Sequence, residues 1–214
     1  GFFFFLAVED RAPLLVGRDD IRRMLGSYDV FSFTEINAGR LSLRPGIRSM
    51  FSSAFDTQAA VSLSTKYLFN KGYEFRAIVG TAPRLPNYDE LYTYFVDVNH
   101  DVQGNPDLNP EQGFSVFLHL NKTFESQSGV QFQTKFSTWY LDMQDRIELV
   151  QRSEETSFRY SNIDTYKTIG ASVNSSMTYK NLTLNAGITY SGTSKVIDGQ
   201  ANPNDDFLKG MQAN

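Results

Sequence analysis

The sequence predicts an all-β chain: an antiparallel, up-and-down transmembrane β-barrel segment, with about eight strands of a larger barrel. Three observations carry this prediction. Apolar and polar residues alternate along many short segments, the connections between these segments alternate between short and long, and aromatic residues gather near the segment ends. The composition agrees, because 18 Phe and 11 Tyr bring the aromatic share of the 214 residues to 14%, and aromatic side chains favour strands.

The alternation is clearest at 182–191, where even-numbered positions are apolar or aromatic and odd-numbered positions are small or polar. A period of two places side chains on two different faces of a strand. The same period runs through 61–69, 114–121, 130–140 and 168–179. After Tyr140 the phase slips, since Leu141 and Met143 change face, and this predicts a bulge or the exit of the strand from the membrane.

The connections fall into two classes. Short, Gly- or Asn-containing turns are predicted at 38–40, 70–72, 125–129 and 180–181. Longer polar stretches lie between them, at 81–112, at 151–164 and from 192 onward. Consecutive connections of an up-and-down sheet leave from opposite ends. The sequence therefore predicts short turns on one rim and long loops on the other, as in outer-membrane barrels.

Aromatic residues form two groups along the predicted strands. The group near the short turns is Tyr67, Phe69, Tyr73, Phe75, Phe124, Phe132 and Tyr179; the group near the opposite ends is Phe51, Phe114, Tyr140 and Tyr190. Two such belts are typical of strands anchored at both membrane–water interfaces. The other face carries polar and charged residues, among them Lys66, Glu74, Arg76 and Lys135, and this indicates a wide lumen that holds water or a plug.

Composition excludes several classes of protein. The chain has no cysteine, so neither disulfides nor Cys-based metal sites are available, and a formal net charge of −4 gives no basic field for nucleic acid. The apolar run at 2–8 lacks the flanks of a signal peptide, and we expect it to be part of a strand. Residues 1–214 are expected to be part of a barrel domain whose closure lies outside this chain, and the family resemblance described below implies a plug domain that also lies outside it.

The stretch 81–112 carries the most specific motif. It contains Thr81-Ala82-Pro83-Arg84, then Glu90-Leu91-Tyr92, and then Gly104-Asn105-Pro106-Asp107-Leu108-Asn109-Pro110-Glu111. This series resembles the "GFRAP", "ELY" and "GNPDLKPE" segments in the barrel of TonB-dependent outer-membrane receptors. Asn109 stands where Lys is usual, and Gly80-Thr81 replaces the usual Phe-Arg pair. The segments 41–48 and 163–170 also resemble strands of this family, so that the resemblance spans roughly 28–192.

The resemblance implies a receptor in the bacterial outer membrane, surrounded by lipid, rather than an enzyme. It implies TonB-dependent uptake of a large, scarce solute such as an iron chelate, a cobamide or a glycan piece, with the TonB system engaged through an N-terminal region outside this chain. No cofactor is implied. The motif residues are expected to be structural, and Glu111 is expected to pair with a base in the lumen. These residues are Ala82, Pro83, Gly104, Asn105, Pro106, Asp107, Leu108, Pro110 and Glu111.

Ligand contacts of such a receptor are expected in the external loops, where aromatic residues and Arg are favoured anchors. The candidates in the long stretch are Arg84, Tyr88, Tyr92, Tyr94 and Phe95. The alternative is that these aromatic rings pack against one another.

Other motifs are weaker. Asp97–Asp101 fails the calcium-loop pattern, which needs Gly and Glu where Val102 and Leu108 stand. His100 and His119 form no zinc pattern, and no nucleophile elbow or phosphate loop is present. The charged run 18–23 is expected to be a solvated external loop. Two alternatives remain open at this point: a passive porin, and a soluble β-sandwich binding module.

Overall fold

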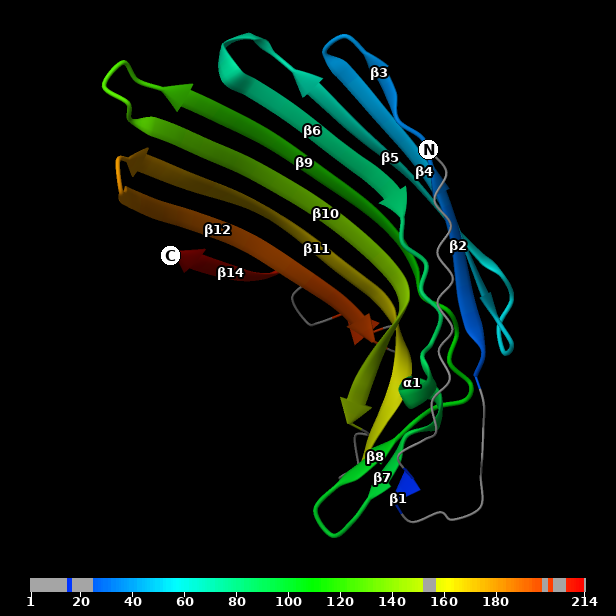
Figure 1. Cartoon of the computed structure of the whole chain (residues 1–214). Helices are drawn as coiled ribbons and strands as arrows, with labels where there is room; N and C mark the ends of the chain where they lie inside the picture. Colours follow the sequence, from blue (N-terminus) through cyan, green and yellow to red (C-terminus); the bar gives the residue numbers. More distant parts are fainter. Residues whose placement is uncertain (1–14, 17–24, 152–156, 198–199, 202–206, 214) are drawn as a thin grey trace.

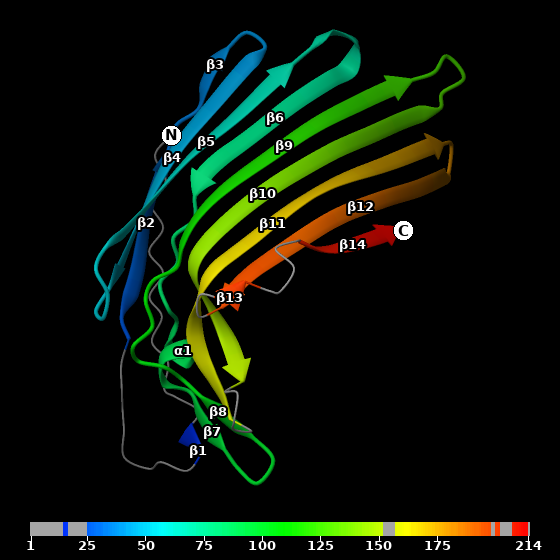
Figure 2. The same cartoon turned by 180° about the vertical axis from the view of Figure 1, so that it is seen from behind.

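The computed structural model describes residues 15–16, 25–151, 157–197, 200–201 and 207–213. The predicted strand at 2–8 and the charged run 18–23 lie outside these residues. The described strands form one 14-stranded sheet, which curves into a trough (Figures 1 and 2). A single curved sheet is the predicted barrel segment and contradicts the β-sandwich, in which two sheets pack face to face.

The trough is an antiparallel meander in which each long strand pairs with the next one along the chain. Its strands are β2 (Ser27–Phe33), β3 (Ile36–Ala38), β4 (Leu41–Ser52), β5 (Gln58–Leu68), β6 (Tyr73–Thr81), β9 (Gln112–Glu125), β10 (Gln131–Gln151), β11 (Phe158–Tyr179), β12 (Leu182–Ile197) and β14 (Leu208–Ala213). Strands β2 and β3 both pair with β4 and stand at one end of the pairing order, while β14 stands at the other.

The remaining elements are short. They are β1 (Leu15–Val16), the 3-10 turn η1 (Asn70–Gly72), α1 (Tyr88–Tyr92), β7 (Tyr94–Val96), β8 (Asp101–Gln103) and β13 (Gln200–Ala201). Within the described part of the chain, no helix is both long and apolar enough to cross a membrane.

The strand register confirms the two predicted faces. One cross-strand row is apolar throughout: Leu41, Tyr67, Phe75, Leu120, Phe136, Val173 and Ile188. The neighbouring row is polar throughout: Ser42, Lys66, Arg76, His119, Ser137, Ser172, Thr189 and Gln212. We call these two sides of the sheet the apolar face and the polar face. Large side chains of the apolar face stay exposed, for example Leu184 at 53% and Ile188 at 47%, which fits contact with lipid.

The rims also follow the prediction in part. The predicted short turns connect β3 to β4, β5 to β6, β9 to β10 and β11 to β12, and they share the upper rim in Figure 1. The opposite rim holds the long connection between β6 and β9. It also holds a short connection, 53–57, between β4 and β5.

Two of the predicted long loops are wrong in extent. Residues 158–163 pair with 146–151, so β10 and β11 continue as a hairpin where the sequence predicted a loop at 151–164. Residues from 192 to 197 continue β12, and 208–213 form β14. Polar side chains misled the prediction here, because a hairpin that projects beyond the apolar band no longer needs apolar residues.

Of the two alternatives predicted after Tyr140, a bulge or the exit of the strand from the membrane, the bulge is wrong and the exit stays a prediction. The pairing of β10 with β11 runs without a shift from Gln131 to Gln144. Leu141 and Met143 instead lie on the polar face, on the same side as Trp139. The Trp139 ring lies over Gly170 in the next strand, where a Cβ would be 2.1 Å from its Cζ2 atom. Large side chains on this part of the polar face therefore pack against their neighbours.

Candidate functional site

The connection between β6 and β9 folds into a compact structure at the long-loop rim. Residues 82–111, together with the projecting ends of β10 (145–151) and β11 (158–164), are called the external lobe below. Strand β8 pairs in parallel with the start of β11, through Phe158 and Val102. The lobe lies below the trough in Figure 1, around α1, β7 and β8.

Local sequence determines the single helical turn of the lobe. The Asn87 side chain accepts a hydrogen bond from the Glu90 N–H at 2.9 Å, and the Glu90 carboxylate accepts one from the Asn87 N–H at 2.9 Å. This reciprocal pair is a capping box, which satisfies two free N–H groups at a helix start. Asp89 and Glu90 in the first turn also suit the positive end of the helix dipole.

A small apolar core holds the lobe together. Its buried members are Leu25, Tyr88, Leu91, Leu108 and Ile147, with exposures of 7% or less. Phe55, Tyr92 and Tyr160 pack around it. These residues come from β10, β11, α1 and three connections, so the lobe is tied to the wall of the trough and does not hang from it as a free loop.

Arg84 joins the two ends of the connection. Its Nη1 atom lies 2.8 Å from Glu90 Oε2, and its Nη2 atom lies 2.5 Å from Glu111 Oε1. The same Glu111 oxygen accepts the Ile147 N–H at 2.8 Å, and the backbones of Arg84 and Glu111 also pair. The hydrogen bond to Glu111 is the main cause that raises the pKa of Arg84 above its ordinary value. The base that pairs with Glu111 is therefore Arg84 of the lobe, and not the lumen base that the sequence predicted.

The Gly104–Glu111 motif lies within the same network. Gly104 N–H donates to Thr93 O at 2.6 Å, and Asn105 N–H donates to Glu90 O at 2.8 Å. The Asn105 side-chain oxygen accepts hydrogen bonds from Asp107 N–H and from the Arg159 guanidinium.

The end of the motif contacts the projecting hairpin. Asn109 N–H donates to the Asn162 side chain at 2.8 Å, and the Asn162 amide donates to Asn109 O and Asp145 O. Among the prolines that were predicted to be structural, Pro83 is buried, Pro110 is half-buried and Pro106 is exposed. The Ala82 N–H donates a hydrogen bond to Gly113 O, where the connection joins the barrel strands.

We expect Gly104→Ala to loosen the lobe. A Cβ at this position would lie 2.6 to 2.7 Å from three backbone atoms of Leu91 and Tyr92, and such overpacking costs about 1–3 kcal/mol. The measurement is limited proteolysis of the folded full-length receptor, with cleavage expected within the lobe. Gly129→Ala is not a suitable control because its φ is +78°, whereas Gly210→Ala has open space and should leave the cleavage rate unchanged.

The five predicted ligand residues take different positions. Tyr88 is 2% exposed and belongs to the lobe core, and Tyr92 packs beside it with its ring centroid 5.0 Å away. Arg84 is the ion-paired residue described above. Tyr94 and Phe95 are half-buried in β7, and Phe95 contacts the His100 ring. The structure thus brings all five into the lobe, but it presents Tyr94, Phe95 and the exposed part of Arg84 more openly than Tyr88.

The remaining sequence candidates have local partners. Asp97 Oδ1 accepts hydrogen bonds from the N–H groups of Asn99 and His100 in the turn between β7 and β8. The bond from Asn99 is the main cause that holds the pKa of Asp97 below its ordinary value. His119 lies on the polar face, with its Nδ1 atom 2.9 Å from Ser137 Oγ. The residues described include no cluster of His, Cys, Asp and Glu that could hold a metal ion.

Sequence reasoning did not identify Glu90, Arg159 and Asn162 as parts of this network. The capping box was readable in advance, because Asn87 and Glu90 have its spacing. The contacts of Arg159 and Asn162 cross 54 and 53 positions of sequence, and no local pattern signals such a pair.

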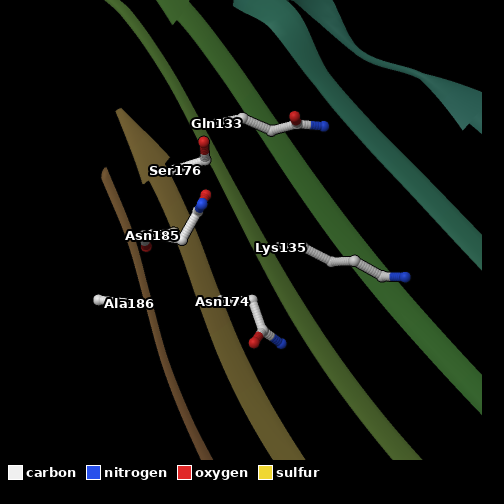
Figure 3. A pocket seen from close by; sticks show the side chains of 7 residues that line it. Gln133, Lys135, Asn174, Ser176, Asn185 and Ala186 are labelled. Atoms are coloured by element: carbon white, nitrogen blue, oxygen red, sulfur yellow. The ribbon is translucent and has the colours of Figure 1, made fainter. Parts of the chain in front are cut away.

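The polar face carries hollows lined by hydrogen-bonding side chains. One of about 360 Å³ lies over β10, β11 and β12, and Figure 3 shows Gln133, Lys135, Asn174, Ser176 and Asn185 projecting from the same side of these strands. Amides and hydroxyls at this density suit a hydrated surface or a polar partner, and they differ from the packed interior that a narrow barrel needs.

A curved antiparallel sheet with one apolar exposed face, one polar face and a folded external lobe defines a segment of an outer-membrane β-barrel. Residues 12–212 match the family model of the TonB-dependent receptor-like β-barrel. The chain belongs to this family, and its place is the bacterial outer membrane.

Individual relatives agree with this assignment. The sequence is 28% identical over 86 residues to the vitamin B12 transporter BtuB of Vibrio vulnificus, a match that covers 40% of this chain and 12% of the relative. The fold is similar to the siderophore receptor PirA of Pseudomonas aeruginosa, with a TM-score of 0.67, 13% identity and coverage of 90% of this chain and 38% of that one. It is also similar to the copper transporter OprC, with a TM-score of 0.66, 18% identity and coverage of 84% and 31%. The chain thus spans well under half the length of these relatives.

Proposed function

We propose that the protein to which this barrel segment belongs takes up a large, scarce solute through the outer membrane with energy from the TonB system. The observation that carries the proposal is the continuous polar face. Its row from Ser42 to Gln212 crosses the whole meander, and β2 and β14 stand at opposite ends of the pairing order. A barrel with this many strands is wide, and its lumen must be filled by water or by a separate domain.

Membership of this family favours a lumen that is filled by a plug domain, with uptake driven by the TonB system, over an open lumen. A plug domain and a segment that engages TonB would then belong to the full-length protein outside residues 1–214. The solute would be an iron chelate, a cobamide or a glycan piece. The similar proteins are a siderophore receptor, a copper transporter and a vitamin B12 transporter, and they favour a metal-containing solute.

The external lobe would form part of the ligand entrance. Tyr94, Phe95 and the exposed part of Arg84 would offer aromatic and cationic contacts to a ligand that arrives from outside. The buried Tyr88 and the half-buried Tyr92 would hold these residues in position.

The test is uptake by the full-length receptor in cells with and without TonB. Radiolabelled ferric siderophores, cobalamin and copper are supplied as separate probes. The expected result is accumulation of one probe only in cells with TonB, while binding of that probe to the cell surface persists in both. Equal accumulation in both cell types would contradict the proposal. A passive porin would in addition let small sugars enter liposomes that contain the purified protein, and the receptor is expected not to do so.

A further inference from the structure

The apolar face carries a polar interruption close to the short-turn rim. It is one cross-strand row, and its residues are Tyr73, Lys122, Thr134 and Ser175. The rows on either side are apolar: Phe75, Leu120, Phe136 and Val173 on one side, and Phe124, Phe132 and Met177 on the other. We propose that the interruption, called the rim site below, binds the head group of an anionic phospholipid.

The rim site lies at the level of a membrane–water interface. Each of its residues is within four positions of the strand end at the short-turn rim, which is the upper rim in Figure 1. Phe124 and Phe132, in the next row towards the turn, are 53% and 42% exposed. Exposed aromatic rings of this kind mark the depth of the lipid head groups. In outer-membrane barrels the short turns face the periplasm, so the lipid belongs to the periplasmic leaflet.

Lys122 brings a positive charge to this level. Its Nζ atom lies 4.1 Å from the centroid of the Tyr73 ring and donates a hydrogen bond to Lys71 O in the turn η1. The side chain is half-buried, so its stem covers apolar surface while its ammonium group reaches the rim. An ammonium group has three N–H donors. Donors therefore remain for a phosphate oxygen.

No carboxylate of the described chain balances this charge. Among the ion pairs of the described residues, none includes Lys122 or Lys71. Glu74 lies on the polar face and pairs with Arg76 there, and the alternation of β9 places Glu125 on that face as well. Lys71 adds a second positive charge in the turn that Lys122 contacts. Two lysines without a carboxylate partner attract an anionic lipid more strongly than a zwitterionic one.

The hydroxyl groups of the rim site favour a lipid over a free phosphate ion. Thr134 Oγ1 and Ser175 Oγ lie 3.0 Å apart on the lipid side of the sheet. One hydroxyl proton of such a pair stays available for a further acceptor. Neighbouring strands are about 4.8 Å apart, so the pair begins one strand away from Lys122. A phospholipid supplies acceptors at both places, because its phosphate meets Lys122 while its glycerol ester oxygens meet the hydroxyl pair.

The experiment measures lipid binding to the purified full-length receptor in detergent by native mass spectrometry. The probes are phosphatidylglycerol with short acyl chains, phosphatidylethanolamine and diacylglycerol with the same chains, and glycerol phosphate without chains. We expect phosphatidylglycerol to bind most tightly of the four. Lys122→Gln is expected to weaken its binding by roughly fivefold, because one lysine near an anionic head group is lost.

Lys135→Gln is the matched control. Lys135 pairs with Asn121, the residue before Lys122, but it lies on the polar face. The substitution removes the same charge at a similar height of the barrel and should leave phosphatidylglycerol binding unchanged. The heat-modified mobility of each variant on gels shows whether the barrel has folded.

Three results would overturn the proposal. The first is an equal effect of Lys122→Gln and Lys135→Gln. The second is binding of phosphatidylethanolamine or diacylglycerol as tight as that of phosphatidylglycerol, since the charge of the head group would then not be recognised. The third is equally tight binding of glycerol phosphate, which would identify a site for a free anion. Lipid binding requires neither TonB nor a transported solute, so its result is independent of the uptake experiment.

Discussion

Val173→Arg is expected to prevent stable assembly of the barrel. Val173 lies in the apolar row, between Phe136 and Ile188 on the adjacent strands, and 38% of it remains exposed in this segment. Its side chain would therefore face lipid. An arginine on the lipid face costs about 2–4 kcal/mol near the middle of the bilayer, which is a large part of the stability of a typical protein domain.

The matched control is Ser172→Arg, at the neighbouring position on the opposite face. Ser172 lies in the polar row between Ser137 and Thr189, so an arginine there would enter the lumen side. The measurement is the fraction of full-length receptor that shows heat-modified mobility in outer-membrane extracts, followed by urea unfolding in lipid vesicles. We expect a strong loss for Val173→Arg and a small change for Ser172→Arg. Equal behaviour of both variants would mean that the two faces are assigned incorrectly.

Glu111→Ala is expected to open the external lobe without unfolding the barrel. The Glu111 carboxylate is 7% exposed and holds both the Arg84 guanidinium and the Ile147 N–H. Removing one member of a buried ion pair costs about 3–5 kcal/mol. We expect a cost near 3 kcal/mol, because Arg84 is partly exposed and keeps its bond to Glu90.

Such a cost should raise the population of the open lobe by roughly a hundredfold, which limited proteolysis of the folded receptor detects as faster cleavage within the lobe. Glu148→Ala provides the control. Glu148 also lies in the lobe, on the projecting end of β10, and pairs with Lys195 and Arg146, but it is more exposed than Glu111, and exposed ion pairs contribute about 0–1 kcal/mol. If both variants were cleaved at the same rate, the Arg84–Glu111 pair would not hold the lobe closed.

The sequence by itself determined the class of fold and the two faces of the sheet. Every second side chain of a strand points the same way, so the apolar row through Phe136 and Val173 and the polar row through Ser137 and Ser172 are readable from alternation alone. The short turns were readable because Gly and Asn mark them. The motif from Gly104 to Glu111 indicated where the lobe lies in the sequence. Ligand contact by the aromatic residues of the lobe remains a prediction.

Only the tertiary structure decided how far the strands extend, which residues meet across the trough and where space is left. The hairpin of β10 and β11 continues through 151 and 158 because its strands pair with each other, whatever the polarity of their side chains. The pairs between Arg84 and Glu111 and between Asn105 and Arg159 join distant positions. The hollow over β10, β11 and β12 is lined by side chains from three neighbouring strands. Alternation within one strand determines a face, but register and packing between strands depend on the whole sheet.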